Sequence, residues 1–73
     1  MVYKFDYRKL RGRIREKGLI QEEIAKKIKV APATLSQKLN NASEFTQSEI
    51  FELCDILEIN HEELSDYFFA EVV

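Results

Sequence analysis

The chain has 73 residues, which suffices for one small domain with one core, so we treat residues 1–73 as a single domain. No apolar run approaches the roughly 20 residues that cross a bilayer, and the first residues lack the apolar stretch of a signal peptide. We therefore expect a cytoplasmic protein without a membrane partner. Cys54 is the only cysteine, which excludes an intrachain disulfide.

Charge divides the chain into two unlike halves. All 11 Lys and Arg residues lie in residues 1–40 beside four acidic residues, a net charge of +7 (11 − 4), whereas residues 41–73 contain nine acidic residues and no Lys or Arg. A polyanion would therefore meet a dipolar molecule rather than a neutral one. The alternative interpretation is that these charges only keep surface helices soluble.

The first predicted helix begins at Asp6, whose carboxylate suits a helix N-cap, and ends at Gly18. Gly12 lies inside this helix, where glycine costs about 1 kcal/mol, so we expect a close packing contact at that position. Four helix starts share a hydrophobic staple, in which an apolar residue before the cap is matched at the fourth helical position. The staple pairs are Phe5 and Leu10, Leu19 and Ile24, Phe45 and Ile50, and Ile59 and Leu64.

The second and third helices are separated by a turn of three residues. The second begins at Ile20, whose side chain cannot cap a helix, and the third begins at Pro32, whose ring suits the first helical position. Asn40 and Asn41 end the third helix, since asparagine tolerates a left-handed backbone.

The fourth and fifth helices begin with predicted capping boxes. Thr46 pairs with Glu49 at the fourth helix, and Asn60 pairs with Glu63 at the fifth. Residues 68–73 are rich in aromatic and β-branched residues, which predicts a short extended tail rather than more helix. This tail could pair with residues 2–5 of the same chain or with a second copy across a two-fold axis.

Apolar residues recur at helical spacing along all five segments, and we expect these stripes to meet in one core. The sequence therefore predicts an all-α domain of five helices. The predicted core residues are Leu10, Ile14, Ile24, Ala25, Ile28, Leu35, Leu39, Ile50, Leu53, Cys54, Leu57, Leu64 and Phe68.

Nothing in the sequence points to catalysis. Cys54 lies on an apolar stripe, which favours a core residue over a nucleophile. His61 is the only histidine and has no neighbouring cysteine cluster, so we expect no metal site. There is no glycine-rich phosphate loop and no paired catalytic constellation. We therefore expect a protein that is not an enzyme and has no cofactor and no small-molecule substrate.

Residues 21–40 have the pattern of a short helix, a turn and a second short helix. Ala25 is small where two helices must pass closely, Val30 fills the corner, and Leu35 holds the second helix from inside. This leaves the outer face of the helix that follows Pro32 open. A helix presented in this way fits the major groove of DNA, with its N-terminal half nearest the base edges.

With its flanking segments, this stretch resembles the phage repressor and Cro family of helix-turn-helix proteins. The resemblance covers residues 7–67 and implies a lambda-repressor-like domain with its helix-turn-helix at about residues 20–40, in the cytoplasm of a bacterial host. The pieces that carry it are Gly18–Ala25, Val30–Ser36 and the downstream helix pair. Lys4–Ile14 and Leu39–Ile50 are similar to a narrower group of small proteins from temperate phages and prophages.

The resemblance implies a transcriptional regulator that binds double-stranded DNA in a sequence-specific way. The residues expected to read bases are Ala33, Thr34 and Gln37. The residues expected to meet phosphates are Gln21, Arg13, Lys27, Lys38 and Asn40. The alternative for Gln37 is a solvated surface glutamine, and that for Thr34 is a structural contact. Lys9, Arg11 and Arg15 are expected to provide general electrostatic attraction.

Three positions depart from the family pattern. Lys29 stands where the turn usually has glycine with a positive φ, at a cost of about 1 kcal/mol, which leaves open whether the turn is altered. Ile20 stands where threonine or serine often caps, and Ala31 stands where serine or threonine often precedes the recognition helix. These departures bear on DNA affinity more than on the fold.

A second function class stays open. A protein of this kind could act as an antirepressor-like modulator that contacts a partner phage repressor. The acidic half would repel DNA but could engage a basic protein surface. The start of the third helix, Ala31–Ala33, is also poor in hydrogen-bond donors.

A single domain of this size makes few DNA contacts, so we expect a weak homodimer on two half-sites, built from the C-terminal tail. The alternative is that the apolar groups at the two ends cover the core of one chain. These groups are Val2, Tyr3, Phe5, Tyr67, Phe68, Phe69, Val72 and Val73.

Overall fold

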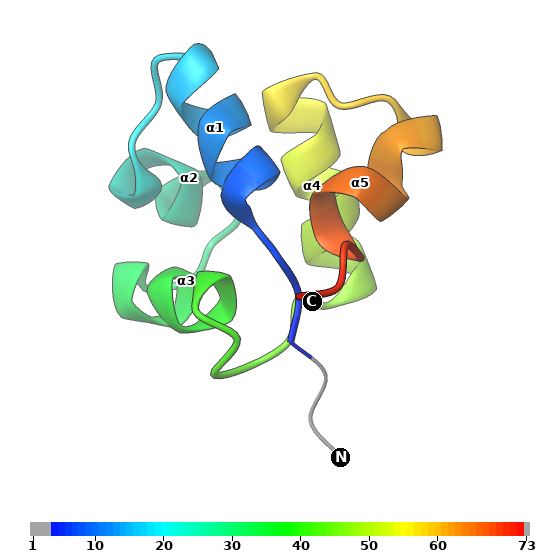
Figure 1. Cartoon of the computed structure of the whole chain (residues 1–73). Helices are drawn as coiled ribbons and strands as arrows, with labels where there is room; N and C mark the ends of the chain where they lie inside the picture. The colour runs from blue at the N-terminus through cyan, green and yellow to red at the C-terminus, as the bar shows by residue number, and fades with distance from the viewer. Residues whose placement is uncertain (1–3, 73) are drawn as a thin grey trace.

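The computed structural model describes residues 4–72, which form five α-helices and one 3₁₀ turn, so the predicted all-α five-helix fold is confirmed. The elements are α1 (Arg8–Glu16), α2 (Gln21–Lys27), α3 (Pro32–Leu39), α4 (Gln47–Leu57), the 3₁₀ turn η1 (His61–Glu63) and α5 (Leu64–Phe68). α2 and α3 lie on one side of α1, and α4 and α5 lie on the other (Figure 1). None of the helices within residues 4–72 has the length and apolar character of a membrane span.

The predicted apolar stripes meet in one core. All of the predicted core residues are buried except Leu64, which is partly buried and packs against the core. Tyr7, Ile59 and Tyr67 are buried there as well. Tyr67 and Phe68 therefore belong to the core of the single chain, as the alternative interpretation of the end groups held, and not to a subunit surface.

The first four helices end in the same way. A residue within two positions of each helix end has a left-handed backbone, with φ of 69° at Gly18, 60° at Lys29, 64° at Asn41 and 54° at Glu58. The amide of the following residue then bonds to a carbonyl five residues earlier, which is the Schellman arrangement. The turn between α2 and α3 therefore keeps the geometry that glycine usually provides, although lysine occupies the position.

The starts of the first two helices differ in detail from the prediction. Tyr7, not Asp6, is the N-cap of α1. The Asp6 carboxylate still serves the first turn, because it accepts a hydrogen bond from the Arg8 amide at 3.0 Å and one from the Arg8 guanidinium at 2.7 Å. These bonds lower the pKa of Asp6 to about 2. At α2 the Ile20 amide donates to the Glu23 carboxylate at 3.2 Å, which satisfies the amide of the N-cap residue, whereas Ile20 provides no side-chain cap for the amides that follow.

Only one of the two predicted capping boxes is complete. At α4, the Glu49 amide donates to the Thr46 hydroxyl at 3.2 Å, and the Thr46 amide donates to the Glu49 carboxylate at 2.9 Å. Asn60 instead accepts from the Glu62 amide at 3.5 Å, and its predicted partner Glu63 does not return a side-chain bond. The reason is that the first turn after Asn60 is the 3₁₀ turn η1, which changes the spacing of the first amides.

The two ends of the described chain lie together (Figure 1). Phe5 and Glu71 form an isolated antiparallel bridge, with backbone hydrogen bonds of 2.6 Å and 3.2 Å beside it. The predicted tail is therefore present, except that its first residue, Phe68, still belongs to α5. It pairs within its own chain, one of the two predicted arrangements. Val2, Tyr3 and Val73, expected to join the same surface, lie outside the described residues.

Gly12 has no packing contact that requires glycine. A Cβ atom at this position would meet no atom within 4 Å beyond its own stretch of α1, so the expected close contact is absent. Gly12→Ala should therefore raise the free energy of unfolding by about 1 kcal/mol, because alanine orders more easily than glycine inside a helix. Urea denaturation at neutral pH measures this change, and a decrease in stability would contradict it.

Candidate nucleic-acid interface

α3 presents one open face to its surroundings. Pro32 occupies its first position, and Ala31 before it is extended, so the chain turns directly from the corner into the helix. Leu35 and Leu39 point into the core and hold the helix against α2. Ala33 and Gln37 are exposed and Thr34 is partly exposed, which places all three predicted base-reading residues on the outer side. We call these three positions the open face of α3.

A second feature lies between α1 and α2. A hollow of about 230 Å³ is lined by Gln21, the first predicted phosphate contact, together with Arg11 and Arg15. The Arg11 guanidinium donates to the Leu39 carbonyl at 3.2 Å and to Asn40 Oδ1 at 3.0 Å, which ties α1 to the end of α3. Arg15 is exposed and makes no ion pair or side-chain hydrogen bond within residues 4–72. We call this feature the α1–α2 hollow.

Arg11 and Arg15, which the sequence predicts as sources of general electrostatic attraction, have defined positions in the structure. Gln21, Asn40, Arg11 and Arg15 now belong to one connected region beside α3. The sequence only weakly indicates this placement, because the arginines at every second position of α1 lie on several faces of the helix. Only the packing of α1 on α2 selects the side to which Arg11 and Arg15 belong.

Arg13, predicted to meet a phosphate, is used inside the fold. Its Nε donates to the Leu57 carbonyl at 2.8 Å and its Nη2 donates to the Glu58 carbonyl at 3.0 Å. A third bond joins it to the Glu16 carboxylate at 3.2 Å. Its side chain is only 24% exposed. Arg13 therefore satisfies the last carbonyls of α4, and we leave it out of the interface.

Lys38, another predicted phosphate contact, is turned inward. Its side chain is 10% exposed and its ammonium group bonds to the Glu49 carboxylate, whose side chain is 12% exposed. Burial by itself would raise the pKa of Glu49, but the hydrogen bonds from Lys38 and Thr46 and the Lys38 charge outweigh it and lower that pKa. Lys38 thus joins α3 to α4 and does not lie on the open face of α3.

Lys27 is exposed, but it lies beside α4 rather than beside Gln21. Together with Lys29 it lines a hollow of about 430 Å³ whose other wall includes Glu52 and Asp55 of α4. It makes no ion pair or side-chain hydrogen bond in the part of the chain that the structure describes. Its charge therefore contributes to the field around the domain, away from the α1–α2 hollow.

The division of charge in the sequence also holds the fold together. Three ion pairs join a base of the first half to an acid of the second, namely Lys9 to Asp66 at 3.6 Å, Lys17 to Glu58 at 2.5 Å, and Lys38 to Glu49. Part of the positive charge is thus neutralised internally. Within residues 4–72, the basic residues with neither an ion pair nor a side-chain hydrogen bond are Lys4, Arg15, Lys26, Lys27 and Lys29.

The structure places Cys54 and His61, the only cysteine and the only histidine of the chain, in different surroundings. Cys54 is buried in the core, and burial raises the pKa of its thiol, with the nearby charge of Asp55 adding to the effect. His61 is exposed and its ring lies 5.0 Å from that of Phe51. Among residues 4–72, no group of three histidine, cysteine or acidic residues is placed to hold a metal ion.

These observations define a small all-α domain in which two short helices, joined by a tight turn, leave one helix face open. The chain belongs to the family described as Protein of unknown function (DUF739), which matches residues 2–71. Among curated proteins, none matches the chain. The family description assigns no activity.

Proposed function

We propose that the protein binds double-stranded DNA as a transcriptional regulator of the phage repressor and Cro type, with α3 in the major groove. The observation that carries this proposal is the open face of α3, which has small and polar side chains at its N-terminal half. An α-helix with such a face fits the width of the major groove. The α1–α2 hollow lies beside it and would meet the phosphate backbone.

The roles of the residues follow from their chemistry. The Gln37 amide can form two hydrogen bonds with an adenine edge, and Ala33 and the Thr34 methyl group can contact a thymine methyl group. Arg15 would meet a phosphate directly, and Gln21 would meet another from the start of α2. The open face itself carries no positive charge, so affinity would come mainly from the cations around it.

We further propose that two copies meet on neighbouring half-sites of DNA. The sequence predicts that the C-terminal tail forms the dimer contact. That tail pairs with residues near Phe5 of its own chain, so its backbone is partly satisfied without a second copy. Binding to one duplex would supply the effective concentration that weakly associating chains need.

Gln37→Ala tests the assignment of the reading face. In binding-site selection from random duplexes, the unchanged chain should prefer adenine at one position of each half-site, since the glutamine amide pairs with that base. The variant should lose the preference at that position, with a cost of about 1 kcal/mol on the selected site. Fluorescence anisotropy with the selected duplex measures the cost.

Gln47→Ala is the matched control, because Gln47 is an exposed glutamine on α4, away from the open face. It should leave the selected motif and the affinity unchanged. If Gln37→Ala selected the same motif as the unchanged chain, Gln37 would not read a base. If no duplex bound at low salt, the proposed function itself would be wrong.

A further inference from the structure

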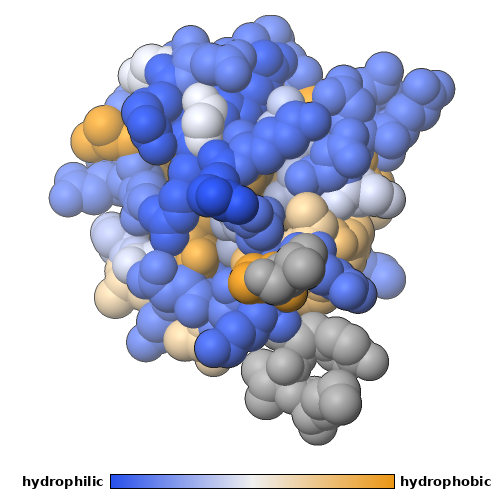
Figure 2. Space-filling model, in the orientation of Figure 1, coloured by the Kyte–Doolittle hydropathy of each residue, from blue (hydrophilic) through white to orange (hydrophobic). Residues whose placement is uncertain are grey.

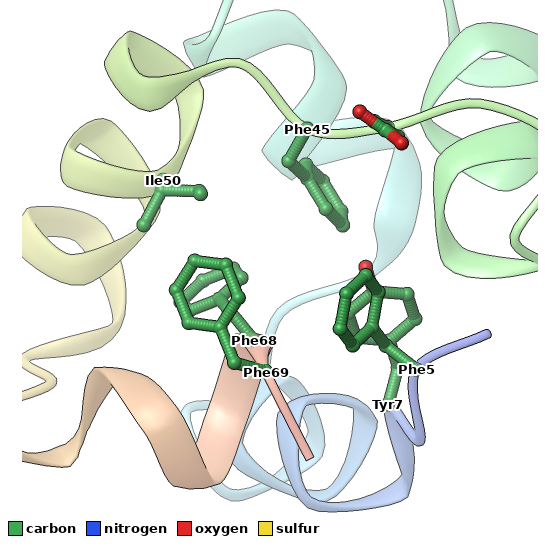
Figure 3. A pocket seen from close by; sticks show the side chains of 7 residues that line it. Phe5, Tyr7, Phe45, Ile50, Phe68 and Phe69 are labelled. Atoms are coloured by element: carbon green, nitrogen blue, oxygen red, sulfur yellow. The ribbon is translucent and has the colours of Figure 1, made fainter. Parts of the chain in front are cut away.

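A pocket of about 150 Å³ lies where the start of the chain, the start of α4 and the end of α5 meet (Figure 3). Its walls are mostly aromatic, and Ile50 closes one side. The aromatic residues come from three segments that are far apart in the sequence, and they are Phe5, Tyr7, Phe45, Phe68 and Phe69. None of them belongs to the proposed DNA interface.

The rings support one another around the pocket. Phe69 contacts Phe5, with centroids 6.0 Å apart, and Phe5 contacts Tyr7 at 6.3 Å. Tyr7 contacts Phe45 at 5.5 Å, and Phe45 contacts Phe68 at 5.8 Å. Three of these four contacts are edge-to-face, the arrangement that aromatic quadrupoles favour. The wall is therefore held in place before any ligand arrives.

One carboxylate completes the pocket. Glu44 lines it, is exposed, and makes no ion pair or side-chain hydrogen bond within residues 4–72. Glu44 and Tyr7 line the same pocket. Burial raises the pKa of the Tyr7 hydroxyl, and the negative charge of Glu44 raises it further. Aromatic faces attract cations and accept alkyl stems, and a free carboxylate pairs with the charged end.

A wider apolar surface adjoins the pocket. A second hollow of about 410 Å³ shares Ile50 and Phe69 with it and adds Phe51 and Leu64. Phe51 is 47% exposed and Phe69 is 50% exposed, which is unusual for residues of this size. Figure 2 shows hydrophobic residues gathered near the C-terminal end on the α4–α5 side, within a mostly hydrophilic face that has smaller apolar spots elsewhere. Apolar surface with a polar rim is typical of a protein-binding site.

Charge determines which kind of partner fits this surface. Residues 41–73 contain no Lys or Arg. A second copy docking here through the same face would bring acids against acids, which is unfavourable, whereas a basic segment would be complementary. In the described part of this half, the acids without an ion pair are Glu44, Glu52, Asp55, Glu62, Glu63 and Glu71.

We propose that the aromatic pocket binds an arginine or lysine side chain from a basic amphipathic segment of a partner protein. The alkyl stem lies among the rings and the charged end pairs with Glu44. A neighbouring apolar side chain of the same segment packs in the second hollow against Phe51 and Phe69. None of the residues that line these two hollows belongs to the open face of α3 or to the α1–α2 hollow, so this surface is separate from the proposed DNA interface.

The probe is a synthetic helical peptide of about 12 residues with arginine and leucine on one face, a length that covers both hollows. The control peptide carries citrulline in place of arginine, which keeps the shape and removes the charge. Titration of the ¹⁵N-labelled full chain should shift the amide signals around Phe45, Phe51 and Phe69. The citrulline peptide should bind about ten-fold more weakly, because it lacks the charge-assisted bond to Glu44.

Variants of the full chain locate the contact. Glu44→Gln should weaken arginine-peptide binding about ten-fold, and Phe69→Ala should weaken it about five-fold. Glu62→Gln makes the same charge change in the same half but outside the pocket, and it should change binding less than about two-fold. All three positions are exposed, so the amide spectrum should stay that of a folded chain.

Three results would overturn this proposal. Equal losses for Glu44→Gln and Glu62→Gln would mean general attraction to an acidic surface. Peptide-induced shifts confined to α3 would place the binding elsewhere. Self-association that Phe69→Ala abolishes would make a second copy the occupant. Glu44→Gln lies outside the C-terminal tail and should change DNA binding less than about two-fold, so this inference and the proposed function can fail separately.

Discussion

Replacing Glu49 by glutamine is expected to lower the free energy of unfolding by about 3 kcal/mol. The Lys38 and Glu49 side chains are 10% and 12% exposed, and they form the most buried ion pair among those of residues 4–72. Glu49→Gln keeps the shape of the side chain and can still accept the Thr46 amide bond, so the α4 cap survives. It leaves the Lys38 ammonium group buried without a countercharge, which is the costly state.

The double variant Lys38→Met with Glu49→Gln separates charge from packing. It removes both charges, so it should be more stable than Glu49→Gln alone, even though it carries one more substitution. Urea denaturation at neutral pH gives the three free energies. A Glu49→Gln effect below about 0.5 kcal/mol, the range of ordinary surface changes, would mean that the pair is solvated and not structural.

The pH dependence of stability provides an independent measure of the same pair. The folded chain lowers the pKa of Glu49 below its usual value of 4.5, through Lys38 and Thr46 and against the effect of burial. The pair therefore contributes its full stability above the pKa of the unfolded chain, and this contribution is lost as the pH falls through the lowered pKa of the folded chain. Glu49→Gln should lack this part of the acid dependence.

The features that could be predicted from the sequence are those set by residues close together along the chain. The Thr46 capping box involves residues three apart, and the apolar stripes recur at a fixed spacing, so both appear as local patterns. The left-handed backbone at Asn41 was predicted, because asparagine at a helix end tolerates it, whereas the sequence left the turn at Lys29 open. The 3₁₀ turn η1 was missed because Asn60 and Glu63 fit a capping box equally well in sequence.

The partners of Arg13 and Lys38, two predicted phosphate contacts, could not be predicted from the sequence, because their side chains are long and their partners are distant. Arg13 meets carbonyls 44 and 45 residues away, and Lys38 meets a carboxylate 11 residues away. In the sequence both look like members of a basic surface. The aromatic pocket was missed for the same reason, because Phe5 and Phe45 read as two separate staples and Phe69 as part of the tail.

Arg13→Ala is expected to lower the free energy of unfolding by about 2 kcal/mol, since it removes charge-assisted bonds from the Leu57 and Glu58 carbonyls. These carbonyls lie at the end of α4, where no amide of the helix can replace the lost donors. The stem of Arg13, which is partly buried, also loses its packing. Urea denaturation at neutral pH measures the loss.

Arg15→Ala is the matched comparison, because Arg15 lies two positions along the same helix and has no partner in residues 4–72. Its stability should change by less than about 0.5 kcal/mol. The logarithm of DNA affinity should fall less steeply with the logarithm of salt concentration, by about 0.9 for the lost phosphate contact, whereas Arg13→Ala should leave that slope unchanged.

A reduced slope for Arg13→Ala with unchanged stability would mean that Arg13 contacts a phosphate after all. An unchanged slope for Arg15→Ala would mean that the α1–α2 hollow does not face the DNA, and the orientation proposed for α3 would have to be abandoned with it.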